Sequence, residues 1–351
     1  MKKIQGSRDF LRQEILTGYY KPGTYLPSVR CLAVRLKLSK SSVHNILKML
    51  QEEGLLVLNP GRGALVAEFH PERPLLKRIF LRPADYGSFN YMPIMNRSMN
   101  GVFAAAERKN VEVNISFSDS EGMTDAMINA HSQGMIQGVI YIQCRNYAGL
   151  IRPLEKASIP YVIANDMHGF PAVKCGIDFR AMTRRAIEYL HRAGHTRIGI
   201  LTGDPDEYIY AESLAAYRET MKELKLKVRS EWVMTSCHRG TTDALFRTFD
   251  LCQEPTAYFT VRDYRAAMVY AAAACRNLRI PRDLSVISFD DCTWDGAASA
   301  GLTTFREPLE ELGENAVELL QQWVASGKKP ESRILIPELI ERGSVSAPKP
   351  D

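Results

Sequence analysis

Five short apolar runs, separated by stretches of helical periodicity, constrain the fold of this 351-residue chain more than any other feature. The runs cover residues 138–143, 161–166, 197–204, 256–263 and 284–291. Amphipathic stretches lie between several of them, including residues 181–194 and 212–226. Apolar strands that alternate with helices are typical of a parallel sheet buried on both faces. The sequence therefore predicts an α/β fold for the larger part of the chain.

The chain is too long for one ordinary core and favours two or three domains. After Val66, the stretch AEFHPERPLLKR mixes Pro71 and Pro74 with charged residues and has no clean period. Because proline breaks helices and stiffens extended segments, this stretch is predicted to be a linker. We expect a first domain, a linker and a larger domain at residues 1–68, 69–77 and 78–346, with a polar tail after them.

The net charge of +5 is unevenly distributed along the chain. Residues 1–70 hold 11 of the 45 Lys and Arg and 5 of the 40 Asp and Glu, a net of +6, which leaves 34 and 35 for the remainder, a net of −1. A basic first domain on a near-neutral body favours a polyanionic partner for the first domain alone. On charge alone, a solvated basic face without a partner remains an equal alternative.

Several classes of protein are disfavoured by what the sequence lacks. The N-terminal MKKIQGSRDFLRQE has no apolar stretch behind its lysines, so we expect no secretory signal. The longest apolar run, residues 266–275, is too short to span a bilayer and is predicted to be a core helix. The seven cysteines are scattered without short pairings, which argues against a zinc site or a disulfide framework. We therefore expect a cytoplasmic protein without a metal or cofactor.

Residues 26–56 contain two short helical patterns separated by a polar break. In the second pattern, apolar residues fall at i, i+3, i+4 and i+7, namely Val43, Ile46, Leu47 and Leu50. Val29, Leu32, Ala33 and Leu36 repeat this spacing in the first pattern, and Ser28 and Ser39 precede the two patterns as N-caps. Arg30, Lys40, Ser41, His44 and Lys48 fall outside the apolar stripes. The stretch therefore predicts a helix-turn-helix whose second helix fits the major groove of DNA.

The segment LLVLNPGRGALVAEF predicts two strands that turn at NPGRG. Gly61 and Gly63 would let the turn approach another backbone closely, and Arg62 offers a cation. Taken alone, this turn is better explained as an ordinary hairpin with an exposed arginine. Directly after a helix-turn-helix, however, a basic hairpin is typical of a DNA-contacting wing.

Residues 15–66 resemble the winged helix of the GntR family of bacterial repressors. The resemblance covers about 50 residues and includes the G-x-x-x-P-G-x-x-LPS-x-R segment, LS-x-x-(S/T)-V, EGLL and GRG. It implies that Arg30 is the base-contacting arginine and that Ser39, Ser41 and Ser42 are capping or phosphate-binding hydroxyls. Two positions where the family usually shows arginine are Lys40 and His44. These differences do not argue against DNA binding, but they prevent transfer of a relative's operator sequence, because lysine lacks the bidentate fork that favours guanine.

In the body, polar residues follow the predicted strands. Ligands of open parallel sheets bind beyond the carboxyl ends of the strands. The polar residues there are Asn165, Asp166, Asp204, Arg262, Asp263, Asp290 and Asp291, and aromatic residues in loops that could cover a ligand are Tyr86, Phe89, Tyr91 and Trp294. Any one of these aspartates is better explained as a helix cap, but the set favours a crevice for a small polar ligand.

The body also resembles the effector-binding region of LacI/GalR regulators and periplasmic sugar-binding proteins. The residues that carry this resemblance span roughly 78–346 and are 194–204, 255–267, 280–291, 302–320 and 335–344. The resemblance implies a periplasmic-binding-protein fold of type I: two Rossmann-like subdomains, a ligand cleft between them and a chain that crosses more than once. It also implies homodimerisation through the body.

The resemblance assigns effector-binding roles to only some positions. Asp290 in SFDD matches the family's effector-binding aspartate, and Asn165 matches its polar residue after a strand. Ser213, before Tyr217, stands where many relatives have an arginine, and Arg262 beside Asp263 stands where asparagine is usual. We therefore hypothesise that Arg262 replaces the missing guanidinium and favours an acidic or heavily oxygenated ligand.

Together these features predict a ligand-responsive DNA-binding transcriptional regulator. We expect a repressor with a two-fold symmetric operator, whose affinity is changed by a sugar or sugar derivative. An enzyme fused to a DNA-binding domain is the alternative, but GxSxG, GxGxxG and HExxH patterns are absent. His191, His195 and His238 stand alone in the sequence and are predicted to be surface or capping residues. A transport-type binding protein is disfavoured by the basic first domain and the missing secretory signal.

Overall fold

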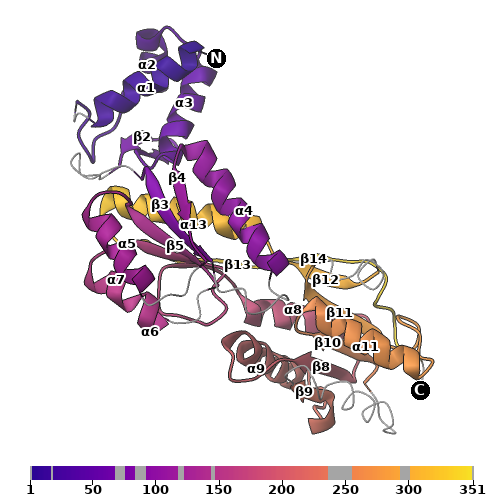
Figure 1. The fold of residues 1–351 in the computed structure, drawn as a ribbon. Helices are drawn as coiled ribbons and strands as arrows, with labels where there is room; N and C mark the ends of the chain where they lie inside the picture. Colours follow the sequence, from indigo (N-terminus) through magenta and orange to yellow (C-terminus); the bar gives the residue numbers. More distant parts are fainter. Residues whose placement is uncertain are drawn as a thin grey trace.

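The computed structural model describes residues 2–16, 19–67, 76–83, 92–117, 122–143, 147–235, 255–292 and 301–349. Residues 2–67 form a small domain, called the head below, at one end of the molecule (Figure 1). Two subdomains, each built on one sheet, follow it, and the first of them lies next to the head (Figure 1).

The head contains three helices and a hairpin. Its elements are α1 (Lys2–Leu16), α2 (Val29–Leu36), α3 (Lys40–Glu52), β1 (Leu56–Asn59) and β2 (Gly63–Val66). Val43, Ile46, Leu47 and Leu50 are buried, and Leu32 of α2 packs with them, so both predicted apolar stripes are confirmed. Helix α1 was not predicted, yet its Leu11 and Ile15 are fully buried in the same core.

A six-stranded parallel sheet forms the first subdomain, in the order β13-β7-β6-β5-β3-β4. Its strands are β3 (Arg78–Pro83), β4 (Glu112–Ile115), β5 (Gly138–Ile142), β6 (Tyr161–Ala164), β7 (Lys174–Ile177) and β13 (Arg333–Leu335). Its helices are α4 (Met92–Lys109), α5 (Gly122–Ser132), α6 (Tyr147–Leu150), α7 (Arg152–Lys156) and α13 (Leu309–Ser326).

The second subdomain has the strand order β14-β12-β11-β10-β8-β9, in which only β14 is antiparallel to its neighbour. Its strands are β8 (Ile198–Thr202), β9 (Val233–Thr235), β10 (Ala257–Thr260), β11 (Ser285–Asp290), β12 (Thr303–Arg306) and β14 (Glu338–Ile340). The helices around it are α8 (Phe179–Arg192), α9 (Tyr208–Glu223), η2 (Ser230–Trp232) and α11 (Asp263–Cys275).

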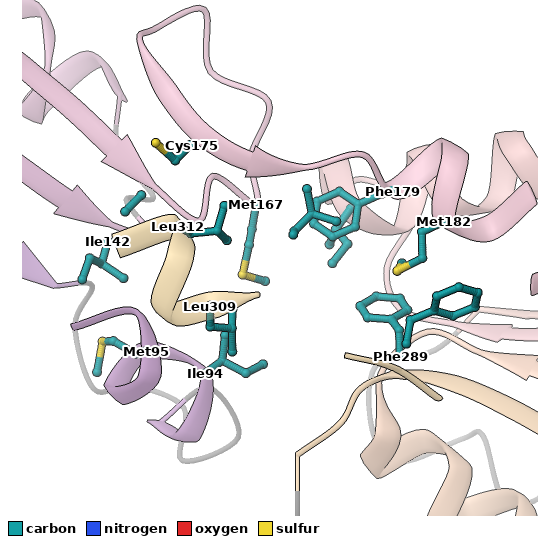
Figure 2. Packing of buried hydrophobic residues seen from close by; sticks show 14 of the residues in the cluster. Ile94, Met95, Ile142, Met167, Cys175, Phe179, Met182, Phe289, Leu309 and Leu312 are labelled. Carbon is teal, nitrogen blue, oxygen red and sulfur yellow. The ribbon is translucent and has the colours of Figure 1, made fainter. Parts of the chain in front are cut away.

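The predicted fold class is confirmed, with two parallel-sheet Rossmann-like subdomains after a helix-turn-helix. The chain passes between the sheets after β7, after β12 and after β13, so each subdomain is assembled from separate stretches. All residues of β5, β6, β8, β10 and β11 are buried, as their apolar runs predicted. One apolar cluster continues across the junction: Figure 2 shows Met167, Leu309 and Leu312 on one side and Phe179, Met182 and Phe289 on the other.

The C-terminal segment and His195 differ from the sequence-based expectation. The C-terminal SAPKPD was predicted to be a polar tail, but its first residue, Ser346, packs against the second sheet. The Ser346 backbone N–H donates to Ser285 Oγ at 3.0 Å, and its carbonyl oxygen lies 2.9 Å from Nε2 of His195. His195 is accordingly buried rather than on the surface.

No helix in the described ranges is both long and apolar enough to cross a membrane.

Candidate functional site

The two helices of the predicted helix-turn-helix begin at the predicted serines. Ser28 Oγ accepts a hydrogen bond from the Cys31 backbone N–H, and Ser39 Oγ accepts one from that of Ser42 at 3.1 Å. The Ser39 hydroxyl also lies 2.9 Å from the hydroxyls of Ser41 and Ser42. Ser39 is therefore committed to capping α3, which fixes where the helix begins and which face it presents.

The outer face of α2 and α3 carries cations. Arg30, Lys40, His44 and Lys48 are all exposed, as is Ser41. Within the described residues, none of the four cationic or titratable side chains forms a hydrogen bond or an ion pair with the protein. By contrast, Arg35, on the opposite side of α2, is held by Glu14 and Tyr20. This face therefore combines positive charge, hydroxyls and free donors, which are the groups that contact phosphates and base edges.

The predicted wing is present and is larger than the hairpin alone. Arg62 lies exposed at the turn between Gly61 and Gly63, whose φ angles of +78° and +105° favour glycine. The segment before α2 pairs with β2: the Leu26 backbone N–H donates to the Ala64 carbonyl at 2.8 Å. Residues 23–26 therefore extend the hairpin into a three-segment sheet, which the sequence did not predict.

Four strands of the body end in a strained residue where the two subdomains meet. Gln143 follows β5, Asn165 follows β6 and Arg262 lies just beyond β10, while Asp290 ends β11. Their φ angles are +55°, +54°, +91° and +139°, in a region that residues other than glycine rarely occupy. Such strain concentrates at functional sites because the surrounding structure must support it. Two of these residues come from each subdomain, so the strained residues gather at the junction between the two sheets, where the ligand cleft was predicted.

Asp290 and Arg262 form a buried ion pair at this junction. Arg262 Nη1 lies 2.5 Å from Asp290 Oδ1 and 3.7 Å from Glu307 Oε1, and all three side chains are at most 1% exposed. Arg262 also lies over the ring of Phe289, 5.1 Å from its centroid. In this conformation the guanidinium of Arg262 is already paired with Asp290, which argues against the hypothesis that it is free for an acidic ligand.

Burial raises the pKa values of the carboxyl groups at this junction. It raises the pKa of Asp263 to about 7, with a further rise from neighbouring Asp290. Burial also raises the pKa of Asp290 to about 7, although the guanidinium of Arg262 opposes this shift. Asp263 accepts hydrogen bonds from Thr304 Oγ1 at 2.8 Å and from the Cys292 N–H at 3.1 Å. Strongly shifted carboxyl groups in a cleft are typical of functional sites.

The first subdomain contributes hydrogen-bond donors to the cleft. The side-chain nitrogens of Gln143 and Asn165 are buried and have no hydrogen-bond partner among the described residues. A buried amide without a partner is costly unless a ligand or water satisfies it. These two side chains can therefore donate hydrogen bonds to a ligand, whereas the carboxylates of Asp290 and Glu307 can accept them.

Other predicted cleft residues have different environments. Asp166 is held by Lys174 at 2.7 Å and by two backbone N–H groups, and Asp291 is held by Arg306 and Arg342. Asp204 is exposed and accepts from the Asp206 N–H. Ser213 is fully buried in α9, where its hydroxyl donates to the Ile209 carbonyl at 2.8 Å. The predicted aromatic residues lie outside the described ranges: Tyr86, Phe89, Tyr91 and Trp294.

Glu307 was missed by the sequence reasoning. It directly follows β12, so an acidic residue after a strand was the available indication, as it was for Asp290. The short run TTFR of β12 was not recognised as a strand, and Glu307 was therefore not placed at the carboxyl edge. Within the described residues, no group of three or more His, Cys, Asp or Glu side chains is arranged to hold a metal ion.

Comparison with known proteins finds matches to family models over two parts of the chain. Residues 8–66 match the gntR family of bacterial regulatory proteins, and residues 187–345 match the periplasmic-binding-protein-like domain. The ribose operon repressor of Escherichia coli K12 is 34% identical over 162 residues, which are 45% of this chain and 49% of that protein. The chain thus matches about half the length of this relative.

Two further relatives cover more of the chain. The arabinose metabolism transcriptional repressor of Geobacillus stearothermophilus is 25% identical over 359 residues, covering 95% of this chain and 96% of that protein. The structure of a LacI-family regulatory protein from Chloroflexus aggregans superimposes with a TM-score of 0.65 and 26% identity, over 76% of this chain and 98% of that one. The chain is therefore similar to gntR-family regulators over residues 8–66 and to periplasmic-binding-protein-like domains over residues 187–345, and its body is similar to LacI-family regulators.

Proposed function

We propose that the protein is a transcriptional repressor whose affinity for operator DNA is changed by a small polar effector. The observation that carries this proposal is the outer face of α2 and α3, where exposed cations without protein partners flank a capped helix N-terminus. Arg30, Ser41, Ser42, Lys40, His44, Lys48, Gly61 and Arg62 are the residues that we assign to DNA contacts. The named repressors among its relatives support this assignment.

The body would sense the effector in the cleft between the subdomains. Donors on one wall and acceptors on the other suit hydroxyl groups, which donate and accept at the same atom. Because Arg262 is already neutralised, we favour an uncharged sugar or sugar derivative over an acid. The names of the ribose and arabinose repressors support a sugar. The residues assigned to this site are Tyr91, Asn165, Ser213, Arg262, Asp263, Asp290 and Trp294, to which we add Gln143 and Glu307.

We also propose the domain boundaries 1–68, 69–77 and 78–346 and a homodimer formed through the body. A dimer presents two recognition helices to a two-fold symmetric operator. By linkage, an effector that weakens operator binding must itself bind less tightly to the operator-bound protein. A regulator of this kind acts in the cytoplasm, where the chromosome is.

Fluorescence anisotropy with DNA that flanks the protein's own gene tests the proposal. We expect salt-dependent binding to a specific fragment, because phosphate contacts release counterions. Arg30→Ala should lose about 1–3 kcal/mol of operator binding if Arg30 contacts a base. Arg218→Ala, which removes an exposed arginine of α9 in the body, is the control and should bind normally. Absence of salt-dependent binding to any duplex fragment would contradict the proposed function.

A screen of sugars and sugar acids by thermal shift tests the effector assignment. A ligand of the native cleft must raise the melting temperature by mass action. The same ligand should then change operator affinity in the anisotropy assay. A ligand that stabilises the protein equally well in Asp290→Asn would argue against the cleft as its site.

A further inference from the structure

The cleft holds more acid than base. The guanidinium of Arg262 contacts two carboxylates, those of Asp290 and Glu307, and a third carboxylate, that of Asp263, lies near Asp290. Asp290 receives the closest contact from Arg262, and its Oδ2 lies 3.3 Å from the Asp263 backbone nitrogen, which donates to it. All four side chains are between 0% and 6% exposed. Water therefore contributes little to the screening of these charges.

Among these carboxyl groups, that of Glu307 has the fewest hydrogen bonds in the described part of the chain. Its carboxylate is fully buried, and in the described part of the chain neither oxygen receives a hydrogen bond. An ionised carboxylate in such a place is costly, whereas the neutral acid avoids most of that cost. Burial raises the pKa of Glu307, although the charges of Arg262 and Arg97 oppose the shift.

The other charged and titratable groups near Glu307 do not supply the positive charge that an ionised Glu307 would need. Arg97 of α4 is already paired in a bidentate manner with Glu310 of α13, at 2.8 and 2.9 Å. The end of β10 and the start of α11 contribute Arg262 and Asp263, and the end of β11 contributes Asp290, with Cys292 following it. The guanidinium of Arg262 is therefore shared between Asp290 and Glu307, and the guanidinium of Arg97 is paired with Glu310.

The cluster lies on the junction between the subdomains. Arg262 Nη2 lies 3.4 Å from Sδ of Met167, which follows β6 in the first subdomain. Arg97, also in the first subdomain, donates to the Glu307 carbonyl at 3.3 Å. Separation of the subdomains would break both contacts and admit water to the cluster. A solvated carboxylate ionises close to its ordinary pKa.

We propose that Glu307 carries a proton while the subdomains are closed on each other, and that opening of the junction releases this proton to solvent. The closed form then binds more protons than the open form. Acid therefore favours closure and alkali favours opening. The proposal goes beyond the proposed regulatory function and needs neither DNA nor an effector to be tested.

Two measurements on the full-length protein test the proposal. Infrared spectroscopy detects a protonated carboxyl group by its C=O stretch, which shifts on exchange into deuterated water. Small-angle scattering between pH 5.5 and about 8.5, a range that spans the pKa of about 7 of the neighbouring aspartates, reports opening as an increased radius of gyration. Glu307→Gln mimics the protonated side chain, and Glu112→Gln, which neutralises an exposed glutamate of β4, is the matched control.

The wild type and Glu112→Gln should both show the acid band at pH 6 and a radius of gyration that rises with pH. Glu307→Gln should show a smaller band and should keep its compact, acidic radius at pH 8.5. Either of two results overturns the proposal: no exchange-sensitive acid band in the wild type at pH 6, or an unchanged pH dependence of the radius in Glu307→Gln. Because the pKa values of Asp263 and Asp290 are raised to about 7, these groups contribute to the same band, and the loss of intensity in Glu307→Gln is what assigns the proton to Glu307.

Discussion

Lys109, the last residue of α4, donates a hydrogen bond from Nζ across 2.6 Å to the main-chain oxygen of Glu52, the last residue of α3. The body thus holds the C-terminal end of the helix whose N-terminal half is assigned to DNA. A cation at a helix C-terminus also interacts favourably with the helix dipole. Burial lowers the pKa of Lys109, as expected for an ammonium group enclosed between two domains.

A cavity of about 720 Å³ lies beside this contact, between the head and the first subdomain. The head contributes Gly54, Val57 and Leu65, and α13 contributes Gln321 and Ala325. Head and body therefore meet around incompletely filled space rather than through a tightly packed interface. Their relative position depends on a few contacts, and the Lys109–Glu52 hydrogen bond is one of them.

We predict that Lys109→Met reduces the response of operator binding to the effector. Coupling between the effector site and the head requires contacts that differ between the effector-bound and effector-free states. Loss of a charged hydrogen bond would destabilise one of these states by about 1–3 kcal/mol. The ratio of operator dissociation constants with and without effector should fall, as measured by anisotropy. Lys222→Met, at an exposed lysine of α9, should leave the ratio unchanged. An unaltered ratio in Lys109→Met would show that this hydrogen bond does not contribute to the coupling between effector binding and operator binding.

Helices α4 and α13 cross at two glycines that leave no room for a side chain. A Cβ on Gly101 would lie 1.9 Å from the Glu310 carbonyl oxygen, and one on Gly313 would lie 2.1 Å from that of Ser98. We predict that Gly101→Ala lowers the free energy of unfolding by about 3 kcal/mol, because the helices must separate. Gly6→Ala in α1, where nothing lies within 4 Å of the added Cβ, should be neutral or slightly stabilising. Chemical denaturation of both variants measures the difference, and equal stability would contradict the tight crossing.

The N-cap of α3 gives a prediction for the head. Ser39→Ala should destabilise the head by about 1 kcal/mol, because the Ser42 N–H loses its acceptor. Ser39→Asp should restore the stability, since aspartate caps helices as well as serine does. Thermal unfolding followed by circular dichroism compares the three proteins. If alanine and aspartate were equally destabilising, the capping role would be wrong.

The wing gives a prediction about salt dependence. If Arg62 contacts a phosphate, Arg62→Ala should weaken binding to all duplex sequences about equally and reduce the slope of log K against log salt by about 1. Arg62→Lys keeps the charge and should keep the slope. A loss confined to one operator sequence would instead indicate that Arg62 reads a base.

The apolar runs predicted β5, β6, β8, β10 and β11, because strands buried on both faces tend to be apolar throughout. Strands without a long apolar run were missed, whether largely buried, such as β12 with TTFR, or partly exposed, such as β4 with EVNI and β13 with RIL. Helix α1 was missed because only a few of its residues enter the core while the rest are polar. The segment 23–26 has no strand periodicity of its own, since its pairing with β2 is a tertiary interaction.

Residues of the site were predicted where they follow a recognisable strand. Arg262 and Asp290 pair at the junction, and Asn165 lies two residues before Met167, which contacts Arg262; the rule of carboxyl strand ends favours these positions, and their ligand-binding roles stay predictions. The pairing of Arg262 with Asp290 and Glu307 was not predictable, because it depends on how β10, β11 and β12 lie side by side. For the same reason, Asp166 was not distinguishable from Asp290 in sequence, although Lys174 neutralises the former.

His195 provides a pH prediction for the second subdomain. Its Nε2 lies 2.9 Å from the Ser346 carbonyl, which can only accept, so Nε2 donates and Nδ1 accepts from Thr256 Oγ1 at 2.8 Å. Burial lowers the pKa of this neutral imidazole. The folded protein therefore binds fewer protons than the unfolded chain just below pH 6.5, and this contribution to stability is lost as pH falls.

We predict that His195→Gln, which keeps a donor but cannot take up a proton, loses less stability than the wild type between pH 7.5 and about 5.5. At pH 7.5 the variant should be less stable than the wild type, because glutamine does not fill the space of the ring. Calorimetric melting temperatures at the two pH values give the comparison. His44→Gln, at an exposed histidine of α3, should lose as much stability on acidification as the wild type. If His195→Gln were as acid-sensitive as the wild type, a different group would have to bind the proton.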